Sequence, residues 1–303
     1  MSGIEKDIPR ENRTDDQKEI QRDIQKEILR DDQKDHQRDD RRDIQKEIRE
    51  DLDEIERKYD VKILLAVESG SRAWGFASPD SDYDVRFIYM QKPEEYLRID
   101  PVKDVIEWQL DEVLDINGWD LKKALFAYAK GNPSVMEWAV SPVIYREDPQ
   151  WGQIRRTALQ YFSEKASLYH YYGLANKTYL GFLTGDMISY KKYFYALRPL
   201  LCCRWIERYH EVPPMEFETL LQLFDGKEED LNDRLFAAIR DLLTRKAVTV
   251  EKDLNPQMPE IIDFIRTECA RQKAISAATP DDRKFDLTAL NECFRRTLGG
   301  FDD

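Results

Sequence analysis

Hydrophobic and polar positions follow different periods in the two halves of the chain. Before about residue 150, short apolar runs of strand length lie between turn residues. After that point apolar residues recur at helical spacing, as Leu235, Ile239 and Leu242 do. The pattern predicts an α+β protein, with a small α/β domain over residues 59–150 and an α-helical domain over residues 151–303. The expected strands cover residues 63–67, 83–90, 105–110 and 112–116.

Helices are also expected, both between these strands and after them. Those of the first half cover residues 71–76, 119–130 and 134–140. Gly131, with Pro133 just beyond it, provides a stop for the second of them. Farther along the chain, Pro199 lies inside the helical pattern of residues 193–209. It is expected to kink that helix or to begin a new one.

Residues 1–58 differ in composition from the rest of the chain, and they predict a charged arm in front of the α/β domain. From residue 15 to about residue 58, an imperfect eight-residue repeat carries acidic, basic and glutamine residues. Eight residues overshoot two helical turns by roughly 80°, so its isoleucines spiral around a helix and do not form a coiled-coil seam. We expect a solvated arm that is helical or partly disordered, with self-association or partner binding as the alternative.

Composition narrows the classes of function. The net charge of −13 disfavours nonspecific binding of polyanions over the whole surface, but it is compatible with a nucleotide or an RNA end in a local basic cleft. No apolar run approaches the length of a membrane span. The four cysteines form no CxxC pair, which favours reduced, buried thiols in a cytoplasmic protein over a disulfide framework or a zinc site.

Candidate chemistry is concentrated in residues 68–86. A Gly70-Ser71 turn follows a buried strand, and its backbone N–H groups and hydroxyl suit a phosphate. Asp82 and Asp84 begin the next strand and project from the same face. Two neighbouring carboxylates repel each other unless a cation lies between them, and Mg²⁺ prefers carboxylates together with substrate phosphates. The combination predicts nucleotidyl transfer, and the alternative is a structural turn followed by a solvated acidic hairpin.

A site with two metal ions would need a third carboxylate from a neighbouring strand. Asp115 is the best candidate because apolar residues flank it, Asp111 is the second, and Asp104 and Glu107 are weaker. In such a site one ion activates the attacking oxygen, while the other stabilises the triphosphate and the leaving pyrophosphate. Two Mg²⁺ ions are therefore the expected cofactors, with Mn²⁺ as a substitute.

Two arginines accompany these motifs. Arg72 directly follows the Gly-Ser turn and could neutralise phosphates. Arg86 shares a strand face with Asp84, so it could neutralise phosphates or equally serve as a structural partner of one of the aspartates. Both interpretations of Arg86 remain open at the level of sequence.

The segment that carries these residues closely resembles a known family. Residues 68–86 are similar to the first motif of the polymerase-β-like nucleotidyltransferases of the YcgL/RlaP type, some of which are linked to RNA-repair pathways. The similarity covers about residues 60–225 and leaves the arm out. Supporting blocks lie at residues 118–125, 130–133, 191–199 and 213–215.

The resemblance implies roles for individual residues of the motif. Gly70 and Ser71 would be the triphosphate-binding turn. Asp82 and Asp84 would be the paired metal ligands. Asp115 would be the third carboxylate and would help to activate the acceptor hydroxyl.

The resemblance also implies that the helical C-terminal half closes over the nucleotide. Lys192 and Arg198 would then reach phosphates from that side. Lys122 and Lys123 are alternatives, although cationic residues on helices are more often simply solvated.

These features together predict a Mg²⁺-dependent nucleotidyltransferase. It would move a nucleoside monophosphate from a nucleoside triphosphate, with ATP as the expected donor, to a hydroxyl acceptor and release pyrophosphate. The resemblance favours an RNA or tRNA 3′ end as the acceptor. A protein side chain or a small molecule as acceptor is a second hypothesis. A third is a noncatalytic nucleotide-binding protein whose arm recruits partners.

Overall fold

The computed structural model describes residues 44–77, 81–110, 113–248 and 253–299. The chain divides into two units, Met1–Asp53 and Glu54–Asp303. Residues 1–43, which hold most of the expected arm and its repeat, lie outside the described residues, whereas residues 44–59 are helical. The sheet and all the later helices belong to the second unit.

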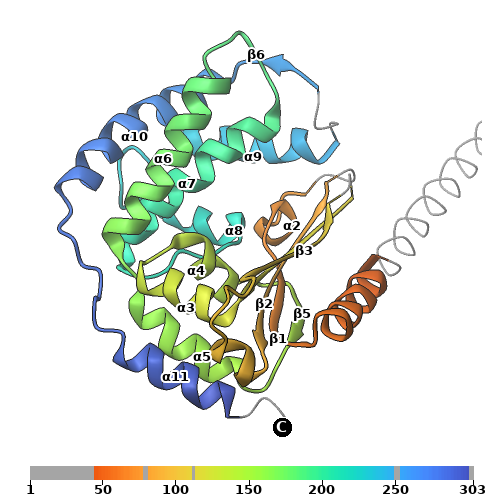
Figure 1. Ribbon diagram of the computed structural model, residues 1–303. Helices are drawn as coiled ribbons and strands as arrows, with labels where there is room; N and C mark the ends of the chain where they lie inside the picture. Colours follow the sequence, from red (N-terminus) through yellow and green to blue (C-terminus); the bar gives the residue numbers. More distant parts are fainter. Residues whose placement is uncertain (1–43, 78–80, 111–112, 249–252, 300–303) are drawn as a thin grey trace, which may run out of the picture. The chain divides into compact units, whose positions relative to one another are not determined.

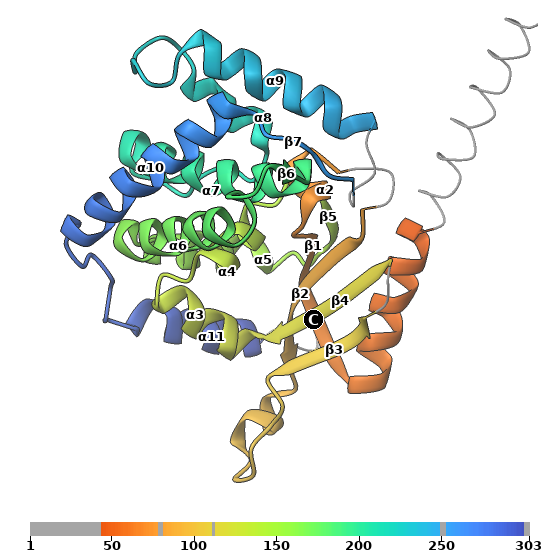
Figure 2. The same cartoon turned by 90° about the horizontal axis from the view of Figure 1, so that it is seen from above.

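A five-stranded mixed sheet lies in the first half of this unit (Figures 1 and 2). Its strands are β1 (Val61–Glu68), β2 (Tyr83–Gln91), β3 (Val105–Leu110), β4 (Leu114–Asp120) and β5 (Ile144–Glu147), in the order β3-β4-β2-β1-β5. β2 and β4 are parallel, and the other neighbours are antiparallel. β1 is buried along nearly its whole length, which explains its unbroken apolar run.

Helices cover the sheet face that carries Ile88 and Met90. They are α3 (Leu121–Ala129), α4 (Pro133–Ala139), α5 (Trp151–Ala158) and α11 (Thr288–Leu298). The helix expected from residue 119 begins two residues later, because Trp119 and Asp120 still pair within β4. The Asp120 carboxylate then caps α3 by accepting a hydrogen bond from a backbone N–H of its first turn.

A second group of helices packs around α7, at the centre of its own hydrophobic core. These helices are α6 (Glu164–Phe182), α7 (Tyr190–Tyr209), α8 (Phe217–Leu220), α9 (Asp233–Val248) and α10 (Pro259–Ala278). α7 continues through Pro199, so the expectation of a new helix at that residue is wrong. The remaining short elements are α2 (Ser71–Trp74), η1 (Pro93–Leu97), η2 (Leu159–Tyr161), η3 (Leu221–Leu223), β6 (Met187–Ile188) and β7 (Asn255–Pro256).

The last helix of the chain returns to the sheet. α11 packs against α3 and α5 (Figure 1), and its Leu290 and Cys293 are buried in the core that these helices share with the sheet. Tyr161 supports this return by donating a hydrogen bond of 2.6 Å to the carbonyl of Asp286. Residues from both sides of the expected boundary near residue 150 thus share one core. All four cysteines are free and buried. None of the described helices is both long enough and apolar enough to cross a membrane.

Candidate active site

The candidate site begins where β1 ends. Glu68, the last residue of β1, is completely buried. Its Oε1 accepts hydrogen bonds from the backbone N–H groups of Gly70 and Asp84, at 3.3 and 2.9 Å, and its Oε2 accepts one from the Tyr145 hydroxyl at 2.7 Å. A buried carboxylate is tolerated only with such partners. Glu68 therefore ties the turn after β1 to the first residues of β2.

Gly70 occupies a position where a side chain would displace Asp84. A β-carbon added at this residue would overlap the Asp84 carboxylate, so the turn can approach that carboxylate closely only with glycine. Ser71 follows as the first residue of α2. Within the described part of the chain its hydroxyl has no hydrogen-bond partner. The turn thus leaves a serine hydroxyl available one residue from the contact with Asp84.

The strand pairing brings two of the predicted acids together. Asp84 and Asp115 lie opposite each other in the parallel pair β2–β4, and residues in register on neighbouring strands point to the same face of a sheet. Their side chains are 32% and 29% exposed. Asp82, the third predicted acid, precedes β2 by one residue and is exposed. The three carboxylates are therefore grouped around the beginnings of β2 and β4.

Arg86 lies between the two opposing carboxylates. Its Nη2 is 2.6 Å from Asp115 Oδ2 and 3.6 Å from Asp84 Oδ1. Its Nη1 donates a hydrogen bond of 2.9 Å to the carbonyl of Asp115. Of the two roles that the sequence left open for Arg86, these contacts correspond to the structural partner, while binding of a phosphate by this residue stays a prediction.

The pKa of Asp84 reflects this crowded setting. Burial raises the pKa of the Asp84 carboxyl to about 6. The guanidinium of Arg86 opposes the rise, whereas Glu68, Asp82 and Asp115 add to it by repulsion. The carboxylates therefore carry more negative charge than Arg86 alone offsets.

This group of oxygen donors fits a hard divalent cation. Among the residues that the structure describes, no three Asp, Glu, His or Cys side chains already converge as ligands, and Asp115 is engaged by Arg86. Asp82 and Asp84 remain as neighbouring carboxylates, and Mg²⁺ commonly takes one or two carboxylates with water and substrate phosphates. Repulsion from Glu68, Asp82 and Asp115 adds to the rise in the pKa of Asp84 that burial causes, and a bound cation would relieve that repulsion.

Arg72 holds the beginning of β2 in place. Its guanidinium donates hydrogen bonds to the carbonyls of Ser81 and Asp82 and lies over the ring of Tyr83, 3.7 Å from the centroid. These contacts make Arg72 a clamp on the segment that carries Asp82. Its direct contact with a phosphate stays a prediction.

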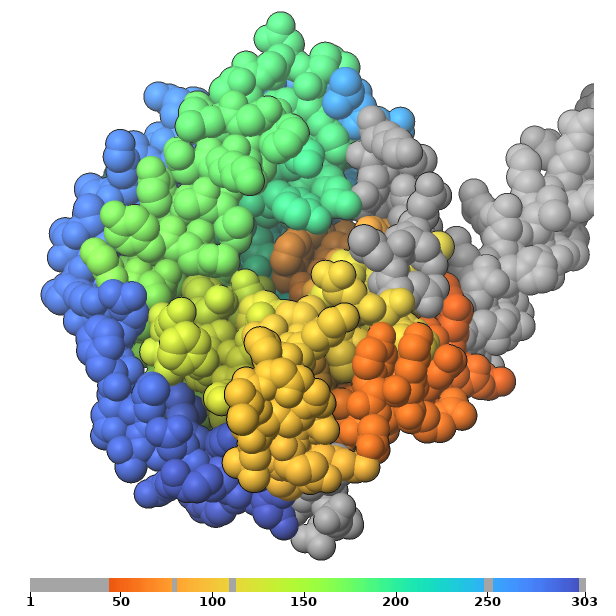
Figure 3. Space-filling view, viewed as in Figure 1, coloured from red at the N-terminus to blue at the C-terminus, as the bar shows by residue number. Residues whose placement is uncertain are grey.

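Aromatic contacts bring α7 next to the Gly-Ser turn. Tyr195 of α7 packs edge-on against Trp74 of α2, with 5.6 Å between the ring centroids. Lys192, one turn earlier, lies over the ring of Phe182 at 4.1 Å. In Figure 3, α2 is visible as an orange-brown patch between the green surface of α6 and α7 and the yellow surface of the strands. The first turns of α7, including Lys192, thus lie beside α2, the helix that begins at Ser71.

Arg198 is buried, unlike a residue that is open to a ligand. It is 3% exposed. Its Nη1 lies 2.9 Å from Glu137 Oε1, its Nε donates to the carbonyl of Met215 at 3.1 Å, and its guanidinium lies 4.6 Å from the ring of Trp74. Arg198 therefore connects α4 and α7 to α2. Its contact with a phosphate stays a prediction.

The alternative residues lie away from these carboxylates. Lys122 and Lys123 begin α3, at the opposite end of β4 from Asp115. Lys123 forms an ion pair of 3.0 Å with Asp104. Asp111, the second candidate for the third carboxylate, lies outside the described residues.

Sequence reasoning misses three residues that build this arrangement: Glu68, Tyr145 and Glu137. The only sequence signal for Glu68 is that an acidic residue directly follows the apolar run over residues 63–67. A charged residue at the end of such a buried strand needs a structural or chemical reason. Tyr145 and Glu137 carry no comparable signal, because their partners lie far away in the sequence.

Known proteins resemble this chain over most of its length. The sequence model of a family described as "RlaP: RNA repair pathway DNA polymerase beta family" matches residues 44–296. The uncharacterized protein YcgL of Bacillus subtilis (strain 168) is 41% identical over 248 residues, which is 82% of this chain and 94% of that protein. A crystal structure of a nucleotidyltransferase-like protein from Exiguobacterium sibiricum 255-15 matches 82% of this chain and 80% of its own, with 13% identity and a TM-score of 0.29. The residues matched by the family include the Gly-Ser turn and the three aspartates.

Proposed function

The chain belongs to the RNA repair pathway DNA polymerase beta family, and from that premise we propose that it transfers a nucleoside monophosphate to a hydroxyl acceptor. The donor is a nucleoside triphosphate, with ATP proposed first, and pyrophosphate is released. The acceptor is an RNA or tRNA 3′ end. The observation that carries this proposal is the opposition of Asp84 and Asp115 on parallel strands, beside a glycine turn in close contact with the Asp84 carboxylate.

Each residue of the site has a part in this reaction. The Gly70-Ser71 turn binds the triphosphate through backbone N–H groups and the serine hydroxyl, which has no competing partner among the described residues. Asp115 orients the acceptor hydroxyl and helps to activate it. As the Asp115 carboxylate accepts the hydroxyl proton, the hydroxyl oxygen forms a bond to the α-phosphorus, the bond from that phosphorus to the oxygen bridging to the β-phosphate breaks, and pyrophosphate leaves. Such transfers depend mainly on positioning and charge stabilisation.

Asp82 and Asp84 are the residues that would hold a divalent cation, and Asp115 would join them. Nucleotidyltransferases generally use divalent cations, and we propose two Mg²⁺ ions, for which Mn²⁺ can substitute. Bound there, the cations supply charge stabilisation for the triphosphate and lower the pKa of the attacking hydroxyl. The chain's own contribution is to hold the carboxylates in place through Glu68 and Arg72.

Arg86 has two successive partners in this proposal. Without substrate it neutralises Asp115 and, more weakly, Asp84. When Asp115 turns to the acceptor, the guanidinium is released and pairs with a phosphate of the donor. Lys192, at the beginning of α7, is the proposed second cation on the side of the helical half.

The proposal is tested by transfer from each of four α-labelled nucleoside triphosphates, with Mg²⁺ and a mixed RNA and tRNA pool. The wild type is compared with Asp82→Asn/Asp84→Asn. The control is Asp263→Asn, which removes a 70% exposed carboxylate on α10. Label in RNA that is lost in the double variant and kept in the control supports the proposal and identifies the nucleotide.

The other outcomes separate the remaining hypotheses. Label found only in protein bands would replace the RNA acceptor by a protein side chain. Equal labelling of RNA by the wild type and the double variant would show that the transfer does not need the carboxylates of Asp82 and Asp84. Nucleotide binding without transfer to any acceptor in the pool would contradict an RNA transferase.

A further inference from the structure

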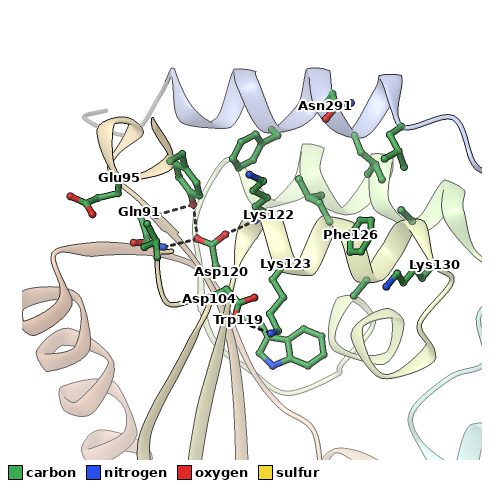
Figure 4. A pocket seen from close by; sticks show the side chains of 18 of the residues that line it. Gln91, Glu95, Asp104, Trp119, Asp120, Lys122, Lys123, Phe126, Lys130 and Asn291 are labelled. Carbon is green, nitrogen blue, oxygen red and sulfur yellow. Dashed lines mark hydrogen bonds and ion pairs between the residues drawn. The ribbon is translucent and has the colours of Figure 1, made fainter. Parts of the chain in front are cut away.

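A cavity of about 960 Å³ lies at the other end of the sheet from the carboxylates. It is lined by the end of β2, by η1, by α3 and by α11 (Figure 4). Gln91, at its edge, follows Asp84 by seven residues along β2, which is about 23 Å in a strand. The cavity is therefore too far from the carboxylates to hold the reacting groups, and the proposed transfer leaves it without a role.

Along this cavity α3 presents a cation, an aromatic ring and a second cation. Lys122, Phe126 and Lys130 are spaced four residues apart and thus share one side of the helix. The ring of Phe126 is 54% exposed although it lies in the middle of the row, and Lys130 Nζ is 4.3 Å from its centroid. Figure 4 shows the three side chains around the same cavity.

The protein offsets the other cations of the cavity with its own carboxylates. Lys123 pairs with Asp104, and Arg98 pairs with Glu95 and Asp100. By contrast, Lys122 and Lys130 have no acidic partner among the described residues. The charged side chains that line the cavity balance in number, four cations against four carboxylates, but Lys122 and Lys130 are the two cations that these ion pairs leave open to a ligand.

The acidic residue at the floor of the cavity is not available to a ligand. Asp120 is 2% exposed, and its carboxylate accepts hydrogen bonds from the Tyr96 hydroxyl at 2.6 Å and from Gln91 Nε2 at 3.4 Å. On the opposite wall, Asn291 of α11 has a side-chain amide with no hydrogen-bond partner in the described part of the chain. An amide of this kind can donate to or accept from the edge of a base.

We propose that this cavity binds the single-stranded RNA that leads to the 3′ end held at the carboxylates. The choice of RNA rests on the proposed function. The choice of a single-stranded nucleic acid rests on Lys122, Phe126 and Lys130. Such a ligand is bound by cations that contact phosphates and by aromatic rings on which bases stack. Lys122 and Lys130 are about 12 Å apart along the helix. An acidic peptide would use the two lysines but would leave the exposed ring between them unexplained.

The direct test measures binding of a fluorescein-labelled oligouridylate by fluorescence anisotropy as a function of salt concentration. The oligouridylate is long enough to reach from Asp84 to Lys130. The variants are Lys122→Gln/Lys130→Gln and Phe126→Leu. The matched control is Lys273→Gln/Lys284→Gln, which removes the same charge from two exposed lysines outside the cavity.

The lysine variant should bind the oligouridylate about tenfold more weakly, with a log-log salt slope that is smaller by about 1.4 because two phosphate contacts are lost. Phe126→Leu should weaken binding about fivefold or more without changing the slope. The control should retain both values. An unchanged affinity and slope in the lysine variant would overturn the inference, as would polyglutamate that competes as strongly as RNA.

A second measurement separates this inference from the proposed transfer. The lysine variant should lose transfer to long RNA and retain transfer to a dinucleotide, which is too short to reach the cavity. Asp82→Asn/Asp84→Asn should lose both transfers but keep its affinity for the oligouridylate. If neither the wild type nor any variant transfers a nucleotide to an acceptor, the proposed function fails. The anisotropy measurement then still decides whether the cavity binds RNA.

Discussion

Glu68 Oε1 accepts a hydrogen bond of 2.9 Å from the backbone N–H of Asp84, sixteen residues away in the sequence. Because the same oxygen also accepts from Gly70, one buried carboxylate sets the position of the Gly-Ser turn and of a candidate metal ligand. Glu68→Ala should leave two backbone donors without a partner, at a cost of about 1–3 kcal/mol each if they remain buried. Urea unfolding and transfer assays should both show the loss. Glu68→Gln, which keeps an acceptor oxygen, is the matched control and should be milder.

Gly70→Ala tests the close contact between the turn and the Asp84 carboxylate. The added methyl group would overlap that carboxylate and push it from its position, so transfer should fall by about 100-fold or more. Gly173→Ala is the control. Gly173 lies in α6, and an added β-carbon there meets no atom within 4 Å. It should leave transfer unchanged and stabilise the fold slightly. Equal activities of the two variants would show that the contact is not needed for transfer.

The sequence predicts well where the turn after β1 and the beginning of β2 lie, because both features are local. The turn after β1 and the beginning of β2 depend on neighbouring residues, and both elements form where the pattern of apolar residues indicates. The opposition of Asp84 and Asp115 depends instead on the parallel pairing of β2 with β4. The sequence names Asp115 as the best of several candidates for the third carboxylate but does not reveal this pairing, and the role of Asp115 stays a prediction.

The features that the sequence does not reveal depend on distant partners. Glu68 is held by Tyr145, 77 residues away. The return of α11 to the sheet is secured by Tyr161 and the carbonyl of Asp286, 125 residues apart. At the beginning of α3 the error is local, because Trp119 and Asp120 precede a strong helical pattern, yet sheet pairing keeps them in β4. Tertiary contacts override local preference there.

Replacing the Asp84 carboxylate should stabilise the metal-free protein. The pKa of this group is about 6 in the folded protein, against 3.8 ordinarily, so the folded state binds more protons between these values and stability falls as the pH rises through them. Asp84→Asn removes this cost. Near pH 7.5 it should gain about 1–2 kcal/mol, less than the roughly 3 kcal/mol of the full shift, because the side chain is 32% exposed and solvent screens it.

The measurement is urea unfolding with a chelator, at about pH 7.5 and again at about pH 4. The gain should shrink at the lower pH, where the wild-type carboxyl is protonated in the folded state. Asp263→Asn is the control and should change stability by less than about 0.5 kcal/mol. Added Mg²⁺ should stabilise the wild type more than Asp84→Asn. A destabilised Asp84→Asn in the chelated protein would contradict the assigned cause of the pKa shift.

Replacing Arg198 should lower stability without weakening the binding of the donor nucleotide. Arg198 and Glu137 form a pair with 4% and 13% of their side chains exposed, and breaking a buried pair from one side costs about 3–5 kcal/mol. Arg198→Leu leaves the Glu137 carboxylate without its cation, whereas Arg198→Leu/Glu137→Leu removes both charges and should recover part of the loss. Urea unfolding gives the stabilities, and the KM for the nucleoside triphosphate reports on the site. An Arg198→Leu protein of normal stability with a raised KM would instead show that this guanidinium binds phosphate, as the resemblance implies.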